Sequence, residues 1–163
     1  MAAGNSITAP ILPDRLDWPS AIGNFILNFG ALDWHLTVFL EGQLPEDEFK
    51  AVKDLYFQDR VKRIQKLVEA DGALSAKRKE FGRFFERLEV IRLLRNQIAH
   101  GQLTVKLTKE SKVEDIFLTQ PKDLDSHAPP QSRALNFNEI VAAMTELTAL
   151  VEEFQTLSGD WKE

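Results

Sequence analysis

The sequence predicts an all-α protein, an antiparallel up-and-down bundle of four main helices with a small β-hairpin and a flexible loop inserted between the third and the fourth. Three observations predict this fold. Four long segments carry apolar residues at three- and four-residue steps, which places those residues on one face of a helix. The period changes to alternation only after residue 101. The chain has 163 residues, 44% of them apolar, and is long enough for a single core.

The domain organisation follows from the same patterns. We expect a flexible N-terminal arm over residues 1–16, where prolines and a glycine interrupt any periodicity. A helical domain should extend over 17–158, with the hairpin and loop insertion at 102–135, and a short tail over 159–163. The sequence thus predicts one helical domain with a flexible N-terminal arm and a short tail.

The first helix is expected from a cap at Asp17 to about Gln43, because Pro45 closes it off. Asp33 projects from within its apolar stripe and is therefore predicted to be a buried charge in need of a partner. A second apolar stripe lies on roughly the opposite side, which marks the helix as central or as an interface. That stripe is a candidate contact with a second copy of the chain and consists of Leu27, Ala31, Trp34 and Val38.

The next two helices are predicted over 46–71, broken near Tyr56–Gln58, and over 81–101, with Ser75 as a possible cap. Gly101 is the residue without a Cβ that helices favour just past their last turn. The second helix carries a basic patch that is interpreted as a solvated face, formed by Arg60, Lys62, Arg63 and Lys66.

The remaining elements are a hairpin and one more helix. Alternation over 103–119 predicts two short strands, and the proline-rich segment 121–133 is predicted to be a flexible loop. Asn136 and Glu139 are spaced as a capping box, so the fourth helix should begin there and run to about Leu157.

Composition excludes several classes of protein. A net charge of −5 argues against a protein that coats nucleic acid non-specifically, because that affinity comes from neutralising phosphates. Cysteine is absent, no apolar stretch is long enough to span a membrane, and residues 1–15 do not resemble a signal peptide, so we expect a cytoplasmic protein. Neither a catalytic triad, nor a phosphate-binding glycine motif, nor a metal-ligand spacing is present, so no cofactor or metal is predicted.

The chemically informative stretch is the end of the third helix. Arg95 falls in the middle of the apolar stripe, where a guanidinium loses water and needs a partner, and we predict that this partner is Asp33. Asn96 and His100, four residues apart, share one face. Residues five apart lie about 140° apart on a helix, so Arg95 and His100 are predicted to need a second copy to form one site.

At these residues the chain resembles the HEPN superfamily of helical proteins associated with nucleic acids. The signature is an arginine, a polar residue and then a histidine near the end of the third main helix, here Arg95-Asn96-x-x-x-His100 flanked by Leu93-Leu94 and Gly101. The resemblance implies a dimeric bundle that is often a metal-independent endoribonuclease acting as a toxin or in defence. It implies that His100 is the general base or acid and that Arg95 stabilises charge on the phosphate. Asn96 would orient the phosphate or the histidine.

Alternatives stay open at this point. His100 can be a helix-end histidine favoured by the dipole, and Arg95 one half of a structural ion pair. The protein can be a non-catalytic helical dimer that binds a partner protein, or an RNA binder without turnover. For a toxin, an antitoxin or another protein is a candidate partner. The third helix has an excess of basic residues, and the candidate RNA contacts on it are Lys77, Arg78, Lys79 and Arg92. His35 is interpreted as a surface histidine.

Overall fold

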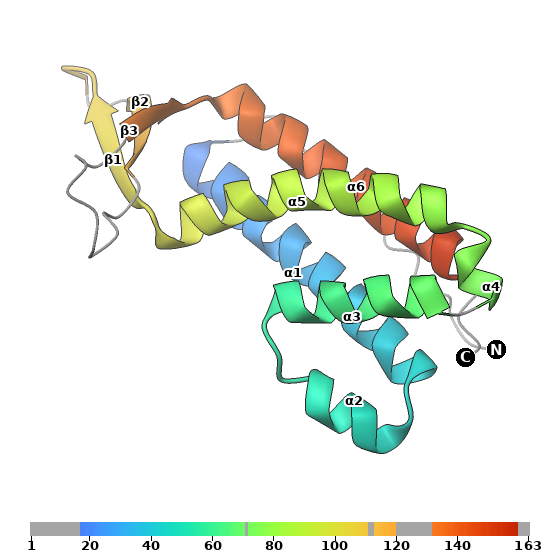
Figure 1. The fold of residues 1–163 in the computed structure, drawn as a ribbon. Helices are drawn as coiled ribbons and strands as arrows, with labels where there is room; N and C mark the ends of the chain where they lie inside the picture. The colour runs from blue at the N-terminus through green and yellow to red at the C-terminus, as the bar shows by residue number, and fades with distance from the viewer. Residues whose placement is uncertain (1–16, 71, 111–112, 120–131, 160–163) are drawn as a thin grey trace, which may run out of the picture.

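The computed structural model describes residues 17–70, 72–110, 113–119 and 132–159 (Figure 1). This part of the chain is mostly helical, as predicted, with six helices and one three-stranded antiparallel sheet. The predicted arm over 1–16, residues 121–131 of the loop predicted over 121–133, and residues 160–163 of the predicted tail lie outside the described residues. The helices are α1 Trp18–Gln43, α2 Glu46–Val52, α3 Phe57–Ala70, α4 Gly72–Ser75, α5 Arg78–His100 and α6 Phe137–Ser158.

Helix α1 is the central helix and packs against α3, α5 and α6. It begins as predicted, because Oδ1 of Asp17 accepts a hydrogen bond from the backbone N–H of Ser20 at 2.9 Å and Pro19 lies in the first turn. Its buried face follows the three- and four-residue steps of the sequence. That face consists of Ala21, Phe25, Phe29, Leu32, His35, Leu36, Phe39 and Leu40.

The predicted second helix is divided in two. Helix α2 ends at Val52 and α3 begins at Phe57, so residues 53–56 connect them close to the predicted break. Figure 1 shows α2 set apart from the long helices, with the 53–56 connection returning the chain to α1. This connection forms part of the cleft described below.

Helix α5 does not begin at a serine cap. Oγ of Ser75 donates to the carbonyl of Gly72 at 3.1 Å within α4, and Lys77 occupies the cap position of α5. The predicted cap is therefore wrong, because a short extra helix uses the serine locally. The apolar residues at three- and four-residue steps over 81–98 are all buried except Phe85, which is half-buried. The buried face of α5 consists of Phe81, Phe84, Leu88, Ile91, Leu94 and Ile98.

The predicted hairpin is present, and a third strand extends it. Strands β1 (Gln102–Leu107) and β2 (Val113–Thr119) are antiparallel, and β3 (Ser132–Leu135) pairs with β2. Strand β3 was not predicted, because its four residues lie beside a proline-rich segment and show no clear alternation. Ile116, Leu118 and Leu135 are buried and attach the sheet to the helical core.

Helix α6 begins at the predicted Asn136, whose Oδ1 accepts from the N–H of Asn138 at 2.8 Å. The Glu139 carboxylate does not complete a capping box, since it pairs with Arg133 of β3 at 2.9 Å. Farther along, Phe154 of α6 packs against Phe39, with ring centroids 5.4 Å apart, and against Phe84 at 5.3 Å. These contacts join α1, α5 and α6 into one core.

Candidate functional site

A cleft of about 580 Å³ opens between α1, the α2–α3 connection and the last turns of α5. Arg95, Asn96 and His100, the three predicted catalytic residues, all line it, and so does Asp33. One chain thus lines a single cleft with all three residues, and the contribution of a second copy to the site stays a prediction. The other lining residues are Ile26, Phe29, Gly30, Leu55, Tyr56, Phe57, Gln58, Arg60 and Arg92.

His100 is the last residue of α5 and its side chain is exposed. Among the described residues, neither ring nitrogen has a hydrogen-bond partner. The following Gly101 has φ −79° and ψ 158°, which is extended backbone rather than the left-handed conformation expected at a helix end. The glycine is required for a different reason, since a Cβ there would lie 2.8 Å from Cδ1 of Leu118 on β2. The sheet thus fixes the helix end that carries His100.

Arg95 is half-buried and has no carboxylate partner among the described residues. Its guanidinium carbon lies 5.6 Å from the centroid of the Phe29 ring, and Nη1 donates to Oδ1 of Asn96 at 3.1 Å. Its Nε is buried and has no partner there. Arg95 therefore keeps its positive charge and free donors in the cleft, as binding of an anion requires.

The predicted Asp33–Arg95 pair is not formed. Instead, Nη2 of Arg60 donates to both carboxylate oxygens of Asp33, at 2.5 and 2.6 Å. The Asp33 side chain is 29% exposed and lines the cleft, so it is not the buried charge that was predicted, and Arg60 reaches it from α3. Arg60 was assigned to a solvated patch, although its side chain is only 11% exposed. The sequence carries no local signal for this pair, because Asp33 and Arg60 are 27 residues apart and meet only through the packing of α3 on α1.

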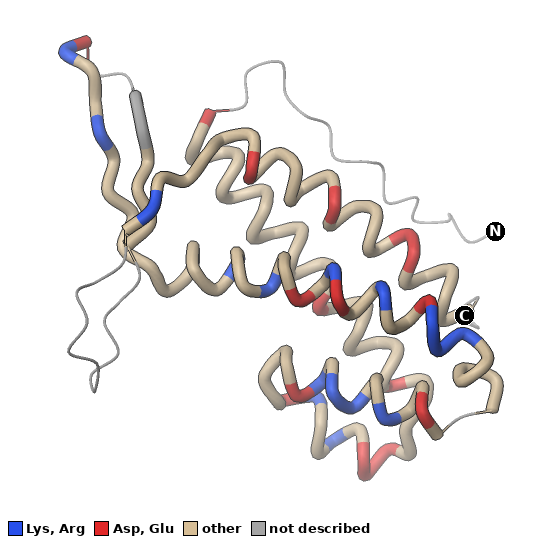
Figure 2. Tube along the Cα trace, turned by 45° about the horizontal axis from the view of Figure 1, so that its top comes forward, with Lys and Arg blue, Asp and Glu red and all other residues tan. Residues whose placement is uncertain are grey.

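Three of the four candidate RNA contacts lie at the far end of α5 from the cleft. Nζ of Lys77 donates to the carbonyls of Thr156 and Leu157 at 3.1 and 3.0 Å, and Nη2 of Arg78 donates to the carbonyl of Glu69 at 3.0 Å. Lys79 is exposed. Figure 2 shows Lys and Arg spread along α3 and α5 among Asp and Glu, not gathered into one patch. With a rise of 1.5 Å per residue, this end lies roughly 30 Å from His100.

Arg92 is the one candidate RNA contact that lines the cleft. Its guanidinium forms two hydrogen bonds of 2.6 Å with the Glu89 carboxylate. These bonds raise the pKa of Arg92 and lower the pKa of Glu89. Part of the positive charge of Arg92 is thereby neutralised, which leaves Arg95 as the strongest candidate for contact with an anion.

His35 is buried, not on the surface as predicted, and lies outside the cleft. Burial lowers its pKa, and its Nε2 has no partner among the described residues. Trp18 packs edge-on against Phe137 at 5.1 Å, whereas Trp34 is 61% exposed. His127 and Trp161 lie outside the described residues.

Two further properties concern the described residues alone. No three His, Cys, Asp or Glu side chains among them are close enough together to hold a metal ion. None of their helices has the length and apolar character needed to cross a membrane. Comparisons of the chain with protein-family models, with curated proteins and with solved structures found no match. The resemblance to the HEPN superfamily therefore rests on the motif.

Proposed function

We propose that the protein is a metal-independent endoribonuclease of HEPN type whose active site is the cleft at the end of α5. The observation that carries the proposal is that Arg95, Asn96 and His100 line one cleft while Arg95 has no carboxylate partner among the described residues. A motif kept only for structure would be expected to have its charge neutralised. Here a cation, an amide and an exposed imidazole share a space large enough for a nucleotide.

In the proposed reaction the nucleophile is a hydroxyl group of the RNA substrate, and the protein supplies the proton transfer and the charge stabilisation. The 2′-hydroxyl oxygen attacks the adjacent phosphorus while its proton passes to a base, and the bond from phosphorus to the 5′-oxygen breaks as that oxygen gains a proton. The products are a 2′,3′-cyclic phosphate and a 5′-hydroxyl. His100 exchanges the proton, because imidazole can do so near neutral pH, and Arg95 stabilises the charge that develops on the phosphate oxygens. Asn96, which is hydrogen-bonded to Arg95, holds the guanidinium in place.

The assembly and the biological role are part of the same proposal. We propose an up-and-down arrangement of α1, α3, α5 and α6 as the frame, and a homodimer that buries the exposed stripe of Leu27, Ala31 and Trp34. Leu27 is 71% exposed, and large apolar side chains grouped on one helix face favour a protein contact. A toxin or defence role, controlled by an antitoxin or another protein partner, follows from the resemblance.

The deciding experiment is cleavage of a labelled RNA pool by wild-type protein and by His100→Ala, with and without EDTA. We expect wild-type cleavage to persist in EDTA and the His100→Ala variant to lose it while keeping the fold and the oligomeric state. Arg95→Lys keeps the charge but loses the fork of donors, so it should retain only part of the activity. Lys79→Ala, at the far end of α5, is the matched control. Metal dependence, or full activity of His100→Ala, would refute the proposal.

A second candidate function is a non-catalytic module that binds a partner protein. The observation in its favour is the set of exposed apolar side chains on α1 and α5, including Trp34 and Val90. It requires that no RNA is cleaved at high protein concentration. The third possibility, an RNA binder without turnover, loses support because Lys77 and Arg78 are hydrogen-bonded to backbone carbonyls. It would show salt-dependent binding that substitutions at these residues weaken.

A further inference from the structure

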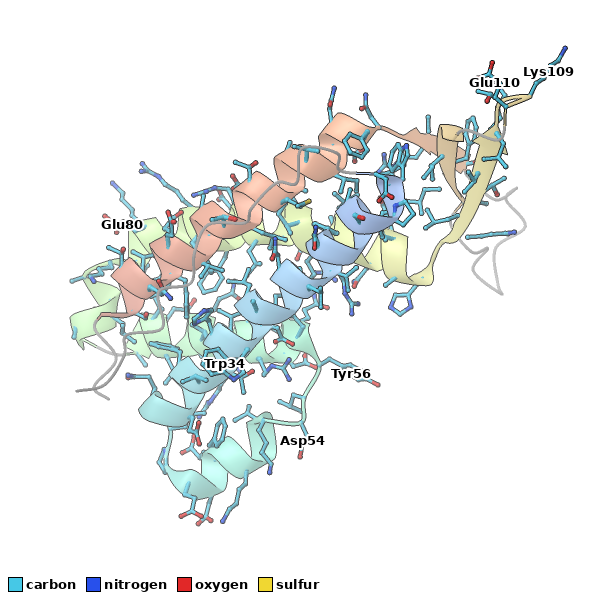
Figure 3. All side chains as sticks on the ribbon, turned by 180° about the vertical axis from the view of Figure 1, so that it is seen from behind. Trp34, Asp54, Tyr56, Glu80, Lys109 and Glu110 are labelled. Carbon is cyan, nitrogen blue, oxygen red and sulfur yellow. The ribbon has the colours of Figure 1, made fainter. Side chains whose placement is uncertain are left out.

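The wall of the cleft that faces the motif is the connection between α2 and α3. It contributes Leu55, Tyr56 and Phe57 to the lining. Tyr56 is 86% exposed and is the one tyrosine of the chain. Figure 3 shows its side chain projecting away from the helices at this connection. A large aromatic ring in that position adds little to the core, so its presence at the cleft needs another explanation.

The backbone that carries Tyr56 is held firmly although the ring is free. The Tyr56 carbonyl accepts the N–H groups of Asp59 and Arg60, at 2.9 and 3.2 Å, at the start of α3. Nη1 of Arg60 donates to the carbonyls of Lys53 and Leu55, at 3.1 and 2.5 Å. Arg60 therefore contacts the connection on both sides of residue 54.

The same guanidinium ties this wall to the rest of the cleft. Nη2 of Arg60 binds Asp33 on α1, and the ring of the adjacent Phe57 packs on Phe29 at 4.8 Å. Phe29 is also the ring beneath the Arg95 guanidinium. Phe29 therefore contacts both Phe57, the neighbour of Tyr56, and the guanidinium of Arg95. This shared contact fixes the position of the Tyr56 segment relative to Arg95.

Arg95 provides an anion-binding group in the cleft, and Tyr56 provides an exposed ring. These two groups match the phosphate and the base of an unpaired nucleotide. Phosphate oxygens bind arginine, and a base that has left its stack binds the face of an aromatic side chain. Stacking of one base on an aromatic side chain changes affinity by roughly 5- to 100-fold. Every base has a face to stack, so the contact tolerates sequence differences.

We propose that Tyr56 is a substrate-binding residue that stacks on an unpaired base beside the phosphate held by Arg95. In this proposal Arg60 is a positioning residue that holds the Tyr56 segment in place through the Lys53 and Leu55 carbonyls. The inference rests on the proposed function, because it takes RNA as the ligand. It adds the residue that binds the base, and with it the requirement that one nucleotide of the substrate is unpaired.

The test measures binding of an uncleavable 2′-O-methyl oligonucleotide, so that it is independent of catalysis. Wild type, Tyr56→Phe and Tyr56→Ala are compared by fluorescence anisotropy, on an intact oligonucleotide and on one with an abasic residue at each position in turn. We expect Tyr56→Ala to weaken binding of the intact oligonucleotide by about 5-fold or more. Tyr56→Phe should bind like the wild type, since it keeps the ring. At one abasic position, wild type and Tyr56→Ala should bind equally.

The positioning role is tested with Arg60→Lys, which keeps the charge but cannot reproduce the planar fork on Asp33 and the two carbonyls. We expect weaker binding of the intact oligonucleotide and little change at the abasic position that removes the effect of Tyr56. If Arg60 acted only through its charge, Arg60→Lys would bind both oligonucleotides like the wild type, and that result would overturn the positioning role. Urea unfolding of each variant verifies that the fold is kept, and Leu107→Ala, which removes an exposed apolar side chain outside the cleft, is the matched control.

The outcomes separate the two proposals. If Tyr56→Ala binds all oligonucleotides like the wild type, or loses affinity equally for intact and abasic ones, the inference is overturned even when His100→Ala abolishes cleavage. If wild type fails to cleave unmodified RNA but shows the base-dependent loss at Tyr56, the endoribonuclease proposal fails and base stacking stands. If wild type binds no oligonucleotide, the inference is overturned, whereas the endoribonuclease proposal is still decided by cleavage of unmodified RNA.

Discussion

Gly101 joins the helix that carries the motif to the sheet, and its replacement by alanine is the sharpest structural test. Its backbone conformation is open to any residue, so the effect of a side chain comes from contacts alone. A Cβ would lie 2.3 Å from the Gln97 carbonyl oxygen, 2.8 Å from Cδ1 of Leu118 and 3.2 Å from the Thr119 carbonyl oxygen. Two of these three neighbours are backbone atoms and cannot rotate away.

We therefore expect Gly101→Ala to lower the free energy of unfolding by about 1–3 kcal/mol, the usual cost of overpacking a fixed site. For a chain of this length each kcal/mol corresponds to roughly 2–4 °C in the melting temperature. Urea unfolding followed by tryptophan fluorescence measures the change. Cleavage should also fall, because the shift needed to relieve the contacts moves His100, the preceding residue.

The matched control is Gly82→Ala in the same helix. A Cβ there meets nothing within 4 Å, and the residue is exposed. Alanine should stabilise this position by roughly 0.5–1 kcal/mol, because glycine loses more backbone entropy in a helix. The same substitution thus has opposite signs at two sites of α5. If Gly101→Ala were as stable as the wild type, the close packing of the helix end on the sheet would be refuted.

Two further predictions concern His35 and Lys77, whose surroundings in the structure differ from those predicted from the sequence. The free energy of unfolding should fall as the pH drops below about 6.5, the ordinary value for histidine, because burial lowers the pKa of His35 and the unfolded state then binds more protons. His35→Gln should flatten this dependence between pH 7.5 and 5.5 in urea unfolding, and an unchanged slope would contradict it. Lys77→Met should lower stability by about 0.5–1.5 kcal/mol through the loss of its bonds to the end of α6, with RNA cleavage unchanged. A selective loss of cleavage would restore Lys77 as an RNA contact.

Local signals predicted most of the helices correctly. The periodic apolar residues of α1, α5 and α6 identified their buried faces, and the caps Asp17 and Asn136 identified two helix starts. These features depend on neighbours within four residues, so the sequence contains the whole interaction. Ser75 shows the limit of such signals, because a one-turn helix competes for the same side chain.

Tertiary partners were harder to predict. Asp33 and Arg60 are 27 residues apart, and nothing in the sequence distinguishes Arg60 from Arg95 as the partner of a buried carboxylate. The choice depends on where the 53–56 connection returns the chain to α1. His35 illustrates the same limit, since its burial follows from the packing of α1 as the central helix and not from its own neighbours.

The position of the cleft on α1 bears on the proposed dimer. At about 100° per residue, the cleft residues Ile26, Gly30 and Asp33 lie roughly 100° around the helix from the exposed stripe that includes Leu27 and Trp34. A dimer formed through that stripe would leave each cleft open beside the interface instead of joining two clefts into one. The separation of Arg95 and His100 around their helix predicts a site shared by two copies, which needs a different contact between them. Since one chain brings the motif residues into one cleft, a monomeric variant with Trp34 replaced by a charged residue can retain the site.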